Sequence, residues 1–302
     1  MKGRAEPTPE SFGASTATTR ALADIHVDNN AQSAGAWDLY ADHRQKLTEL
    51  VAAHGPRRRV AILGAGNCND LDLAALAKSF EEVHLADLDP AALVRALRRQ
   101  TTRTRRRLFT HAGHDLSGLV TRLPRWRRRA PDLETLARAA PAAAAQVVAQ
   151  LPGPFDVVVS DCFLSQIAWT CFRALGEGPL LEAVLDVAVA AHLRTLVALT
   201  RPGGRCLLVT DVVSSESQPL ERLLPHADPG AVLRDLDRRS ELFSGTSPSL
   251  AHVMLTADPD LAREVEDVSV ISPWLWDVSP RRKVLVCALA FGRRRVVTGP
   301  SS

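Results

Sequence analysis

The clearest pattern of apolar and polar positions lies in residues 59–73, RVAILGAGNCNDLDL. Four apolar residues, 60–63, lead directly into Gly64-Ala65-Gly66, and a helix-like pattern follows. A short apolar run that ends in a glycine-rich turn is typical of a buried parallel strand passing into a helix. Glycines there permit a tight turn and the close approach of a ligand. We therefore predict the first strand–helix unit of a doubly wound α/β sheet, with a nucleotide-like cofactor at its carboxyl edge. An ordinary strand-to-helix turn is the alternative.

Apolar runs alternate with amphipathic stretches along the rest of the chain, which favours one α/β domain. The predicted strands are 60–63, 82–87, 106–111, 155–160 and 205–213, followed by two closing β-like runs, 268–278 and 283–291. The predicted helices are 35–55, 70–80 with Asn69 or Asp70 as N-cap, 91–100, 132–150 with a break at Pro141, 179–200, 219–224, 229–242 and 248–265.

The chain of 302 residues is long enough for one large domain with additions. Residues 1–20 are polar and rich in Pro, Ser and Thr, so we predict a disordered leader. We expect a helical segment over 21–56, the main domain over 57–293 with an insertion at about 117–150, and a polar tail over 294–302.

Composition places the protein among ordinary globular chains, with 46% hydrophobic and 24% charged residues. The N-terminus lacks the apolar core of a secretory signal, and no apolar run is long enough for a membrane span. The five cysteines form no CxxC or Cys/His metal pattern. We therefore predict a cytoplasmic protein with reduced, mostly buried thiols and no metal.

Two cofactor classes compete for a glycine-rich turn followed by an acid at the end of strand two, here Asp87. The dinucleotide fingerprint G-x-G-x-x-G requires a third glycine, and this chain has Asn69 at that position. Asp70 and Asp72 also place negative charge where a diphosphate would lie, and like charges repel. A cofactor with a positive amino group and no phosphate has no such problem. NAD is disfavoured on both counts.

Several motifs, in order along residues 58–291, resemble those of the class I S-adenosylmethionine-dependent methyltransferases. They are LGAGN at 63–67, HLADLDP at 84–90, GHDL at 113–116, FDVVVSD at 155–161, RPGGRCLLV at 201–209 and RKVLVCALAF at 282–291. The resemblance implies a Rossmann-like, three-layer α/β/α fold whose sheet is mostly parallel with an antiparallel last strand. It also implies S-adenosyl-L-methionine as the cofactor.

The resemblance further implies which residues bind this cofactor. Asp87 is the candidate for the ribose hydroxyls, Asp115 for the adenine amino group, and Ser160, Asp161 and Cys162 lie along the methionine and methyl end. The implied cofactor-binding residues include Gly64, Ala65, Gly66, Asn67, Asp87, Leu88, Asp115 and Asp161. Each acid has a simpler alternative reading, as a turn former or a solvated side chain.

The sequence also departs from the family pattern. Cys68 replaces the usual third glycine, and Ile62 stands where an acid often precedes the first glycine. Residues 160–163 read Ser-Asp-Cys-Phe rather than the Asn-Pro-Pro-Tyr typical of methylation at planar amide or base nitrogens. This difference argues against such substrates.

The segment before strand one offers further candidates. Tyr40 and Arg44 are spaced i, i+4 on a predicted helix, and family members often use an N-terminal segment as a lid. Arg44 is a candidate to clamp the methionine carboxylate, with surface packing as the alternative. His43 is a weak candidate for a general base, and we assign no catalytic residue.

We therefore predict methyl transfer to an O or N atom of a small-molecule acceptor, with the oligomeric state unassigned and no membrane partner. Twelve of the residues from Arg95 to Arg129 are Arg and only one is Asp, so an RNA methyltransferase is the first alternative. Trp126 would then stack on a base. A non-catalytic scaffold with the same fold is the second alternative.

Overall fold

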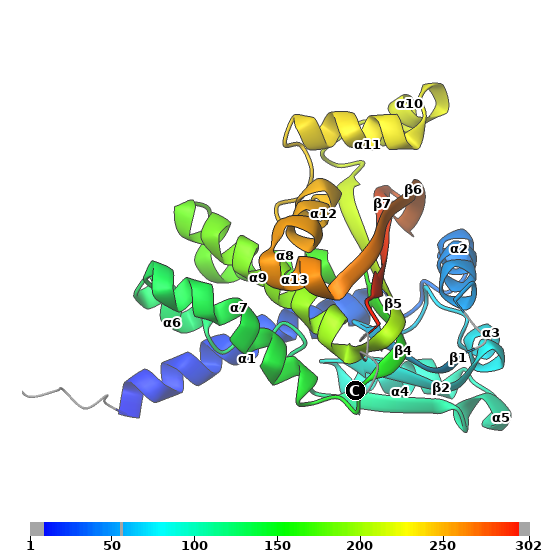
Figure 1. Ribbon diagram of the computed structural model, residues 1–302, viewed down its shortest axis with the longest axis horizontal. Coiled ribbons are helices and arrows are strands. Elements are labelled where there is room, and N and C mark those ends of the chain that lie inside the picture. The colour runs from blue at the N-terminus through cyan, green and yellow to red at the C-terminus, as the bar shows by residue number, and fades with distance from the viewer. Residues whose placement is uncertain (1–8, 55–56, 296–302) are drawn as a thin grey trace, which may run out of the picture.

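The computed structural model describes residues 9–54 and 57–295. Its centre is a seven-stranded sheet in the order β3-β2-β1-β4-β5-β7-β6 (Figure 1). Strands β1 to β5 pair in parallel, whereas β7 runs antiparallel to both β5 and β6. The strands are β1 Arg57–Leu63, β2 Phe80–Asp87, β3 Leu108–Ala112, β4 Phe155–Asp161, β5 Thr200–Ser214, β6 Val265–Ser279 and β7 Arg282–Arg293. The predicted α/β fold with an antiparallel last strand is confirmed.

Helices cover both faces of the sheet (Figure 1). The α-helices are α1 Pro9–Gln32, α2 Ala41–Ala52, α3 Leu73–Ser79, α4 Pro90–Arg98, α5 Thr102–Arg105, α6 Leu123–Arg128, α7 Leu133–Val148, α8 Phe163–Leu175, α9 Pro179–Leu199, α10 Leu220–Leu223, α11 Pro229–Arg238, α12 Pro248–Ala257 and α13 Pro259–Glu264. A 3₁₀ turn, η1, spans Leu224–His226. The part of the chain that the structure describes contains no helix long and apolar enough to cross a membrane.

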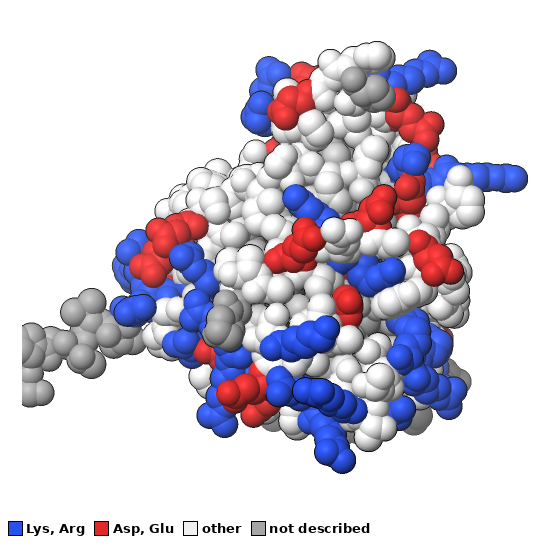
Figure 2. Space-filling model, turned by 90° about the vertical axis from the view of Figure 1, so that its right-hand side faces the viewer, with Lys and Arg blue, Asp and Glu red and all other residues white. Residues whose placement is uncertain are grey.

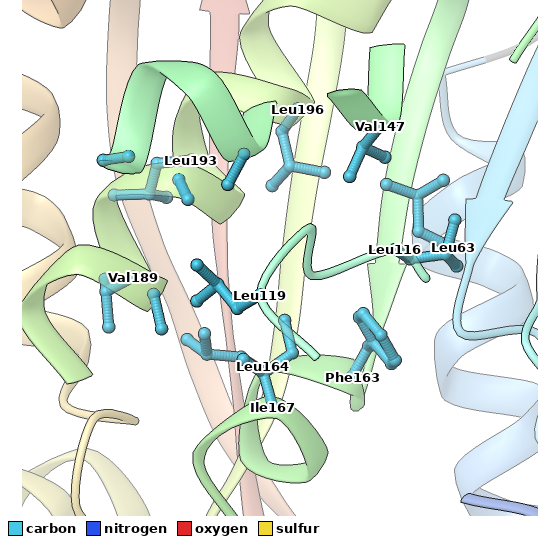
Figure 3. Packing of buried hydrophobic residues seen from close by; sticks show 14 of the residues in the cluster. Leu63, Leu116, Leu119, Val147, Phe163, Leu164, Ile167, Val189, Leu193 and Leu196 are labelled. Atoms are coloured by element: carbon cyan, nitrogen blue, oxygen red, sulfur yellow. The ribbon is translucent and has the colours of Figure 1, made fainter. Parts of the chain in front are cut away.

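Successive residues of β1 belong to two different hydrophobic cores. Val60 and Ile62 pack with α2, α3 and α4, whereas Ala61 and Leu63 pack with α7, α8 and α9. This follows from the strand geometry, in which neighbouring side chains point to opposite faces. Figure 3 shows part of the core that contains Ala61 and Leu63, where Leu63 and Val147 lie among residues of α8 and α9. The continuous apolar run of β1 is therefore needed because both faces of the sheet are buried.

Two local predictions about helices were wrong. Helix α3 is capped by Asp72, whose carboxylate accepts hydrogen bonds from the amides of Ala74 and Ala75. Asp70 therefore lies before the helix and does not cap it. Helix α7 continues through Pro141, where a break was expected. Its neighbours Ala140 and Ala143 are buried in the core, and this packing outweighs the hydrogen bond that proline removes.

The N-terminal region is largely helical. Helix α1 begins at Pro9, within the predicted disordered leader, whereas residues 1–8 lie outside the described residues. Residues 296–302 of the predicted tail are also outside them. The C-terminal half of α1 contacts α4, α6 and α8, so it lies against the main domain (Figure 1). All five cysteines are free and buried, as predicted.

Candidate functional site

The glycine-rich turn after β1 is held by the acid that ends β2. Gly64 and Gly66 have φ values of +78° and +48°, which disfavour residues with a Cβ. One carboxylate oxygen of Asp87 accepts a hydrogen bond from the Gly66 amide at 2.8 Å, and the other accepts one from the Asp89 amide at 2.8 Å. Asp87 therefore fixes both the turn and the start of α4. Its predicted contact with ribose hydroxyls stays a prediction.

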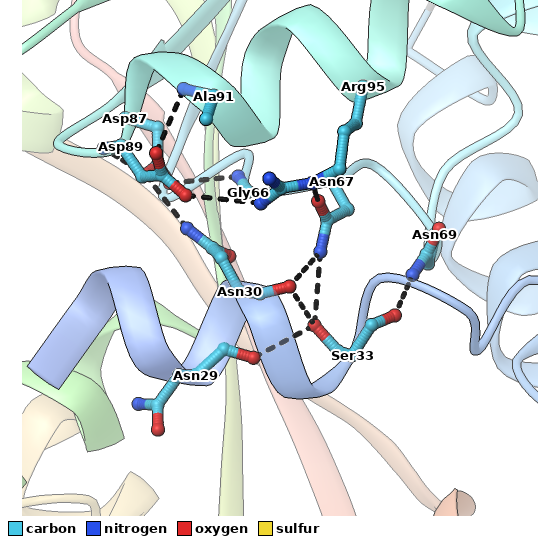
Figure 4. A network of polar contacts seen from close by, with 10 residues as sticks. All are labelled: Asn29, Asn30, Ser33, Gly66, Asn67, Asn69, Asp87, Asp89, Ala91 and Arg95. Carbon is cyan, nitrogen blue, oxygen red and sulfur yellow. Dashed lines mark hydrogen bonds and ion pairs between the residues drawn. The ribbon is translucent and has the colours of Figure 1, made fainter.

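Asn30 of α1 also reaches Asp87. Its amide nitrogen donates a hydrogen bond to the Asp87 carboxylate at 3.3 Å (Figure 4). Burial raises the pKa of Asp87, while the Asp89 and Gly66 amides act in the opposite direction. The carboxylate is thus buried beneath α1, which supplies a side-chain donor to it.

A pocket of about 180 Å³ opens beside the same turn. We call it the carboxylate pocket. Its walls come from the glycine turn, the ends of β4 and β5, and the β6–β7 hairpin. Its lining includes Gly64, Ala65, Gly66, Asn67, Asn69, Asp70, Asp161, Cys162, Ser165, Asp211, Tyr40, Trp276 and Arg282.

Several buried acceptor atoms at the base of this pocket have no amide, hydroxyl or cationic donor among the described residues, namely both oxygens of Asp161, Oδ1 of Asp70 and the amide oxygen of Asn69. The two carboxyl groups lie within hydrogen-bonding reach of each other. Burial raises the pKa of Asp70 to about 6. Burial, and then the charge of Asp70, raises the pKa of Asp161 well above its usual range. Neighbouring buried carboxyl groups of this kind hold a shared proton when no cation is present.

His43 lies close to the same acids, but it does not complete a metal site. One nitrogen of His43, Asp161 and Cys162 lie within 4.8 Å of one another. The indole of Trp274 donates a hydrogen bond to Nδ1 of His43 at 3.0 Å. Because an indole nitrogen only donates, the neutral imidazole carries its proton on Nε2, the nitrogen that a metal would need. Burial also lowers the pKa of His43 to about 3, so the ring is neutral.

A second, nearly filled hollow lies on the other side of the turn, and we call it the covered end. Leu88, Leu116, Phe163 and Ile167 line it, and the imidazole of His26 from α1 lies against them. Only about 10 Å³ of space remains there. The His26 ring nitrogens lie 3.2 Å from the amide oxygen of Gln166 and 3.0 Å from the hydroxyl of Thr170. Burial lowers the pKa of His26.

Asp115, for which the family resemblance implies a contact with adenine, lies at the covered end. Its carboxylate accepts hydrogen bonds from the amides of Ser117, Gly118 and Val120 and from the Ser117 hydroxyl. These bonds make it the organiser of the loop after β3. A contact with adenine stays a prediction.

The remaining predicted site residues are spread over different environments. Tyr40 lines the carboxylate pocket, with its ring edge against Trp276. Arg44 instead donates to the backbone carbonyls of Trp37 and Asn69, at 2.6 and 2.8 Å. Asn67 links the turn to α1, because its amide nitrogen donates to the Asn30 carbonyl at 2.6 Å. The clamp of Arg44 on a carboxylate is untested.

Ser160 does not line the carboxylate pocket beside Asp161 and Cys162, with which it was grouped in the sequence. Its side chain points to the opposite face of the sheet from that of Asp161, because alternate residues of a strand do so. There it lies 2.7 Å from Nε2 of His192 in α9. The placement of Ser160 in the pocket was therefore wrong.

Four residues that the structure brings to the cleft were not predicted as site residues. His26 and Asn30 lie in a polar stretch without a motif, and Ser165 and Asp211 come from α8 and the end of β5. The Ser165 hydroxyl donates to the Asp211 carboxylate at 2.5 Å inside the pocket. Only the position of Asp211, at the carboxyl end of a parallel strand, offered a signal.

The arginine-rich segment has a mixed structural role. Trp126 is only 7% exposed and belongs to the core, so the prediction that it stacks on a base was wrong for this structure. Arg95 donates to the side-chain oxygen of Asn67, and Arg99 to its backbone carbonyl. Arg103, Arg106 and Arg128 are exposed. Figure 2 shows basic side chains gathered over the lower part of one face, with a few acids among them.

The strand order and the reversed β7 settle the fold class. The chain has the class I methyltransferase fold. No family model matches the sequence, and no curated protein matches it.

Solved structures similar to the chain include several methyltransferases. N-methyltransferase NodS from Bradyrhizobium japonicum WM9 is 12% identical, with 87% of this chain and 99% of that chain covered and a TM-score of 0.39. The YcgJ protein from Bacillus subtilis is 14% identical, with 84% and 99% covered and a TM-score of 0.43. An rRNA methylase from Streptococcus thermophilus is 11% identical, with 83% and 95% covered and a TM-score of 0.39. We draw no conclusion about activity from similarities at this level.

Proposed function

We propose that the protein transfers a methyl group from S-adenosyl-L-methionine to an O or N atom of a small-molecule acceptor. The observation that carries this proposal is the set of buried acceptor atoms on Asn69, Asp70 and Asp161 beside the glycine turn, which receive no hydrogen bond from the described residues except the one between the two carboxyl groups. Buried acceptors without donors are costly, by about 1–3 kcal/mol for each group. They suit a ligand that brings its own donors and a positive charge.

The charge of the pocket favours this cofactor over a dinucleotide. S-adenosylmethionine carries an ammonium group with three N–H donors and a sulfonium, whereas the diphosphate of NAD is an anion. Asp70 and Asp161 would attract the former and repel the latter. In this arrangement Asp161, Asp70 and Asn69 bind the amino group, and Asp87 receives the ribose once Asn30 gives way.

The remaining pocket walls supply the acceptor side. Tyr40 and Trp276 form an aromatic wall, and the Ser165–Asp211 pair adds polar groups. When bound, the cofactor supplies an activated methyl group to a nucleophile that lies in line with it. The protein's part is to hold the acceptor close and aligned, an effect worth roughly 7–11 kcal/mol in well-oriented systems. Burial raises the pKa of Asp211, so this carboxyl group is a better proton acceptor than a solvated one.

Calorimetric titration of S-adenosylmethionine, S-adenosylhomocysteine and NAD tests the cofactor. We expect the first two to bind and Asp161→Asn to weaken their binding by about ten-fold or more, because a charge-assisted hydrogen bond is lost. Asp87→Ala is a poorer test, since it also removes the support of the Gly66 amide. Asp132→Asn is the matched control, because it changes an exposed acid that caps α7 and asparagine caps equally well.

Each other outcome contradicts a stated part of the proposal. Binding of NAD alone would indicate a dehydrogenase in place of a methyltransferase. Binding of the methyl donor with no transfer to any small amine or alcohol, but with transfer to RNA, would favour the RNA methyltransferase. The exposed arginines support that second candidate, and its RNA complex should weaken steeply with salt. If none of the three cofactors binds, either to the unmodified protein or to variants that lack the contacts of α1, the non-catalytic scaffold would be favoured.

A further inference from the structure

Helix α1 places two of its side chains where the proposed cofactor would place its adenosine. The carboxamide of Asn30 donates to Asp87 at 3.3 Å, as a ribose hydroxyl would. The imidazole of His26 lies among Leu88, Leu116 and Ile167, with its centroid 5.9 Å from that of the Phe163 ring. A planar nitrogen heterocycle is thus already present at the covered end, and the hydrogen-bond donor to Asp87 comes from Asn30 in the wall of the carboxylate pocket.

The end of α1 is tied to the glycine turn by polar contacts (Figure 4). The amide nitrogen of Asn67 donates to the Asn30 carbonyl at 2.6 Å and lies 3.1 Å from the Ser33 hydroxyl. Asn69 donates to the Ser33 carbonyl at 2.5 Å. The last carbonyls of a helix have no partner within it, so the turn supplies what the end of α1 lacks.

Apart from these contacts, the side chains of residues 19–32 of α1 are weakly buried. Among residues 19–32, Leu22 is buried and Ile25 is partly buried, whereas Val27 is 38% exposed. Elements with few buried apolar contacts open more readily than the core of a domain. Opening of α1 would therefore cost less than opening of a core helix.

The link between α1 and α2 has a firm anchor of its own. Trp37 lies under the guanidinium groups of Arg44 and Arg99, whose central carbons are 3.6 and 4.7 Å from its ring centroid. Arg44 also holds the Asn69 carbonyl, and Arg99 the Cys68 carbonyl at 3.3 Å. The helix before Trp37 can leave the cleft while the link stays in place.

We infer that α1 is an autoinhibitory helix, with His26 and Asn30 occupying the adenosine site, so that the cofactor binds only after α1 leaves. This inference rests on the proposed function for the identity of the ligand. It also accounts for the size of the carboxylate pocket. About 180 Å³ is below the roughly 300–1,000 Å³ usual for small-molecule sites. The open pocket suits the amino-acid part of the cofactor, and the covered end suits the remainder.

Competition of this kind lowers the apparent affinity by the fraction of molecules in which α1 is open. Removing the contacts that hold α1 should therefore tighten cofactor binding. We would titrate S-adenosylhomocysteine into the full chain, the variant His26→Ala/Asn30→Ala, and the single variant Asn30→Ala. The control is Asp28→Ala, on the exposed side of the same helix.

We expect the double variant to bind about ten-fold more tightly, the single variant by an intermediate factor, and the control to bind like the full chain. Hydrogen exchange provides a second readout. Exchange of the α1 amides in the unmodified protein should become faster when S-adenosylhomocysteine is bound, because α1 has been displaced. Should the double variant fail to unfold cooperatively, the single variant and the exchange measurement still decide.

Three results would overturn the inference. Equal or weaker binding by the variants would show that α1 does not compete, while leaving the proposed cofactor intact. Slower exchange of α1 on binding would show a lid that closes over the ligand. No binding by any of the proteins would overturn the proposed function and this inference together.

Discussion

The carboxylate pocket and the covered end belong to one cleft, yet their polar groups are treated in opposite ways. At the covered end, the loop amides satisfy Asp115 and α1 fills the space with His26, while Asn30 of the same helix brings a donor to Asp87. In the carboxylate pocket, both oxygens of Asp161 and Oδ1 of Asp70 are buried, and the proton shared by the two carboxyl groups is their only hydrogen bond from the described protein. Buried polar groups in native proteins are nearly always paired. The difference teaches that one end is closed by the chain itself, whereas the other keeps acceptors for a ligand.

The two ends should also respond differently to substitutions, which alter backbone strain at one and charge at the other. Gly64 stands between them, and the carboxyl pair lies wholly on one side. Substitutions at these positions separate the backbone of the cleft from its electrostatics.

Gly64→Ala should destabilise the protein by about 3 kcal/mol. Its φ of +78° disfavours a residue with a Cβ, and that Cβ would lie 2.6 Å from Cβ of Phe163, which belongs to both the core and the covered end. The free energy of unfolding in denaturant measures the effect.

Gly113→Ala is the matched control for this substitution. Its φ of +77° is nearly the same, but an added Cβ meets nothing within 4 Å. We expect a loss of about 1 kcal/mol from the backbone alone. Equal losses at the two positions would show that the contact with Phe163 does not matter.

Asp70→Asn should stabilise the protein at pH 8 by about 2 kcal/mol and have little effect at pH 4. Burial raises the pKa of Asp70 to about 6 in the folded state, above the value of about 4 in the unfolded chain. The folded state thus binds the proton more tightly, so stability is full below about pH 4 and is lost as the pH rises through 6. Thermal unfolding at several pH values measures this.

The same variant should lose affinity for the methyl donor, because it removes a charge that the ammonium group would use. This trade between stability and binding is the signature of a ligand site. Asp132→Asn, an exposed cap on α7, should show neither the stabilisation at high pH nor the loss of affinity. A pH dependence of Asp70→Asn identical to that of the unmodified protein would mean that Asp70 is not a protonated buried acid.

Trp274→Phe should destabilise the protein by about 1 kcal/mol. It removes the hydrogen bond to Nδ1 of His43 that joins β6 to α2 beside the carboxylate pocket. A chemical-shift change of His43 in nuclear magnetic resonance would report the freed nitrogen. Trp169→Phe is the control, since Trp169 is 45% exposed on α8. The assignment of the His43 proton to Nε2 would be wrong if the His43 resonances did not change.

Local sequence patterns determined the order of the strands along the chain and the glycine turn after the first of them, but not helices α1 and α8. A continuous apolar run before Gly64 is enough to place a buried strand, because both of its faces must avoid water. The acid at the end of the next strand, Asp87, then lies at the same edge of the sheet. The closing pair of β runs, with the turn near Pro280, also followed from local signals.

Only the tertiary structure decided which polar groups meet. The sequence could not tell whether Asp70 or Asp72 caps α3, because both are good caps, and the shift of two residues leaves Asp70 in the pocket with Asp161. Nor could it place α1, whose polar sequence has no strong apolar face to mark its partner. Contacts such as Asn30 with Asp87 join residues 57 positions apart and depend on how the whole sheet is assembled. Short-range periodicity records which residues are buried, but pairing across a cleft is fixed only when the chain has folded.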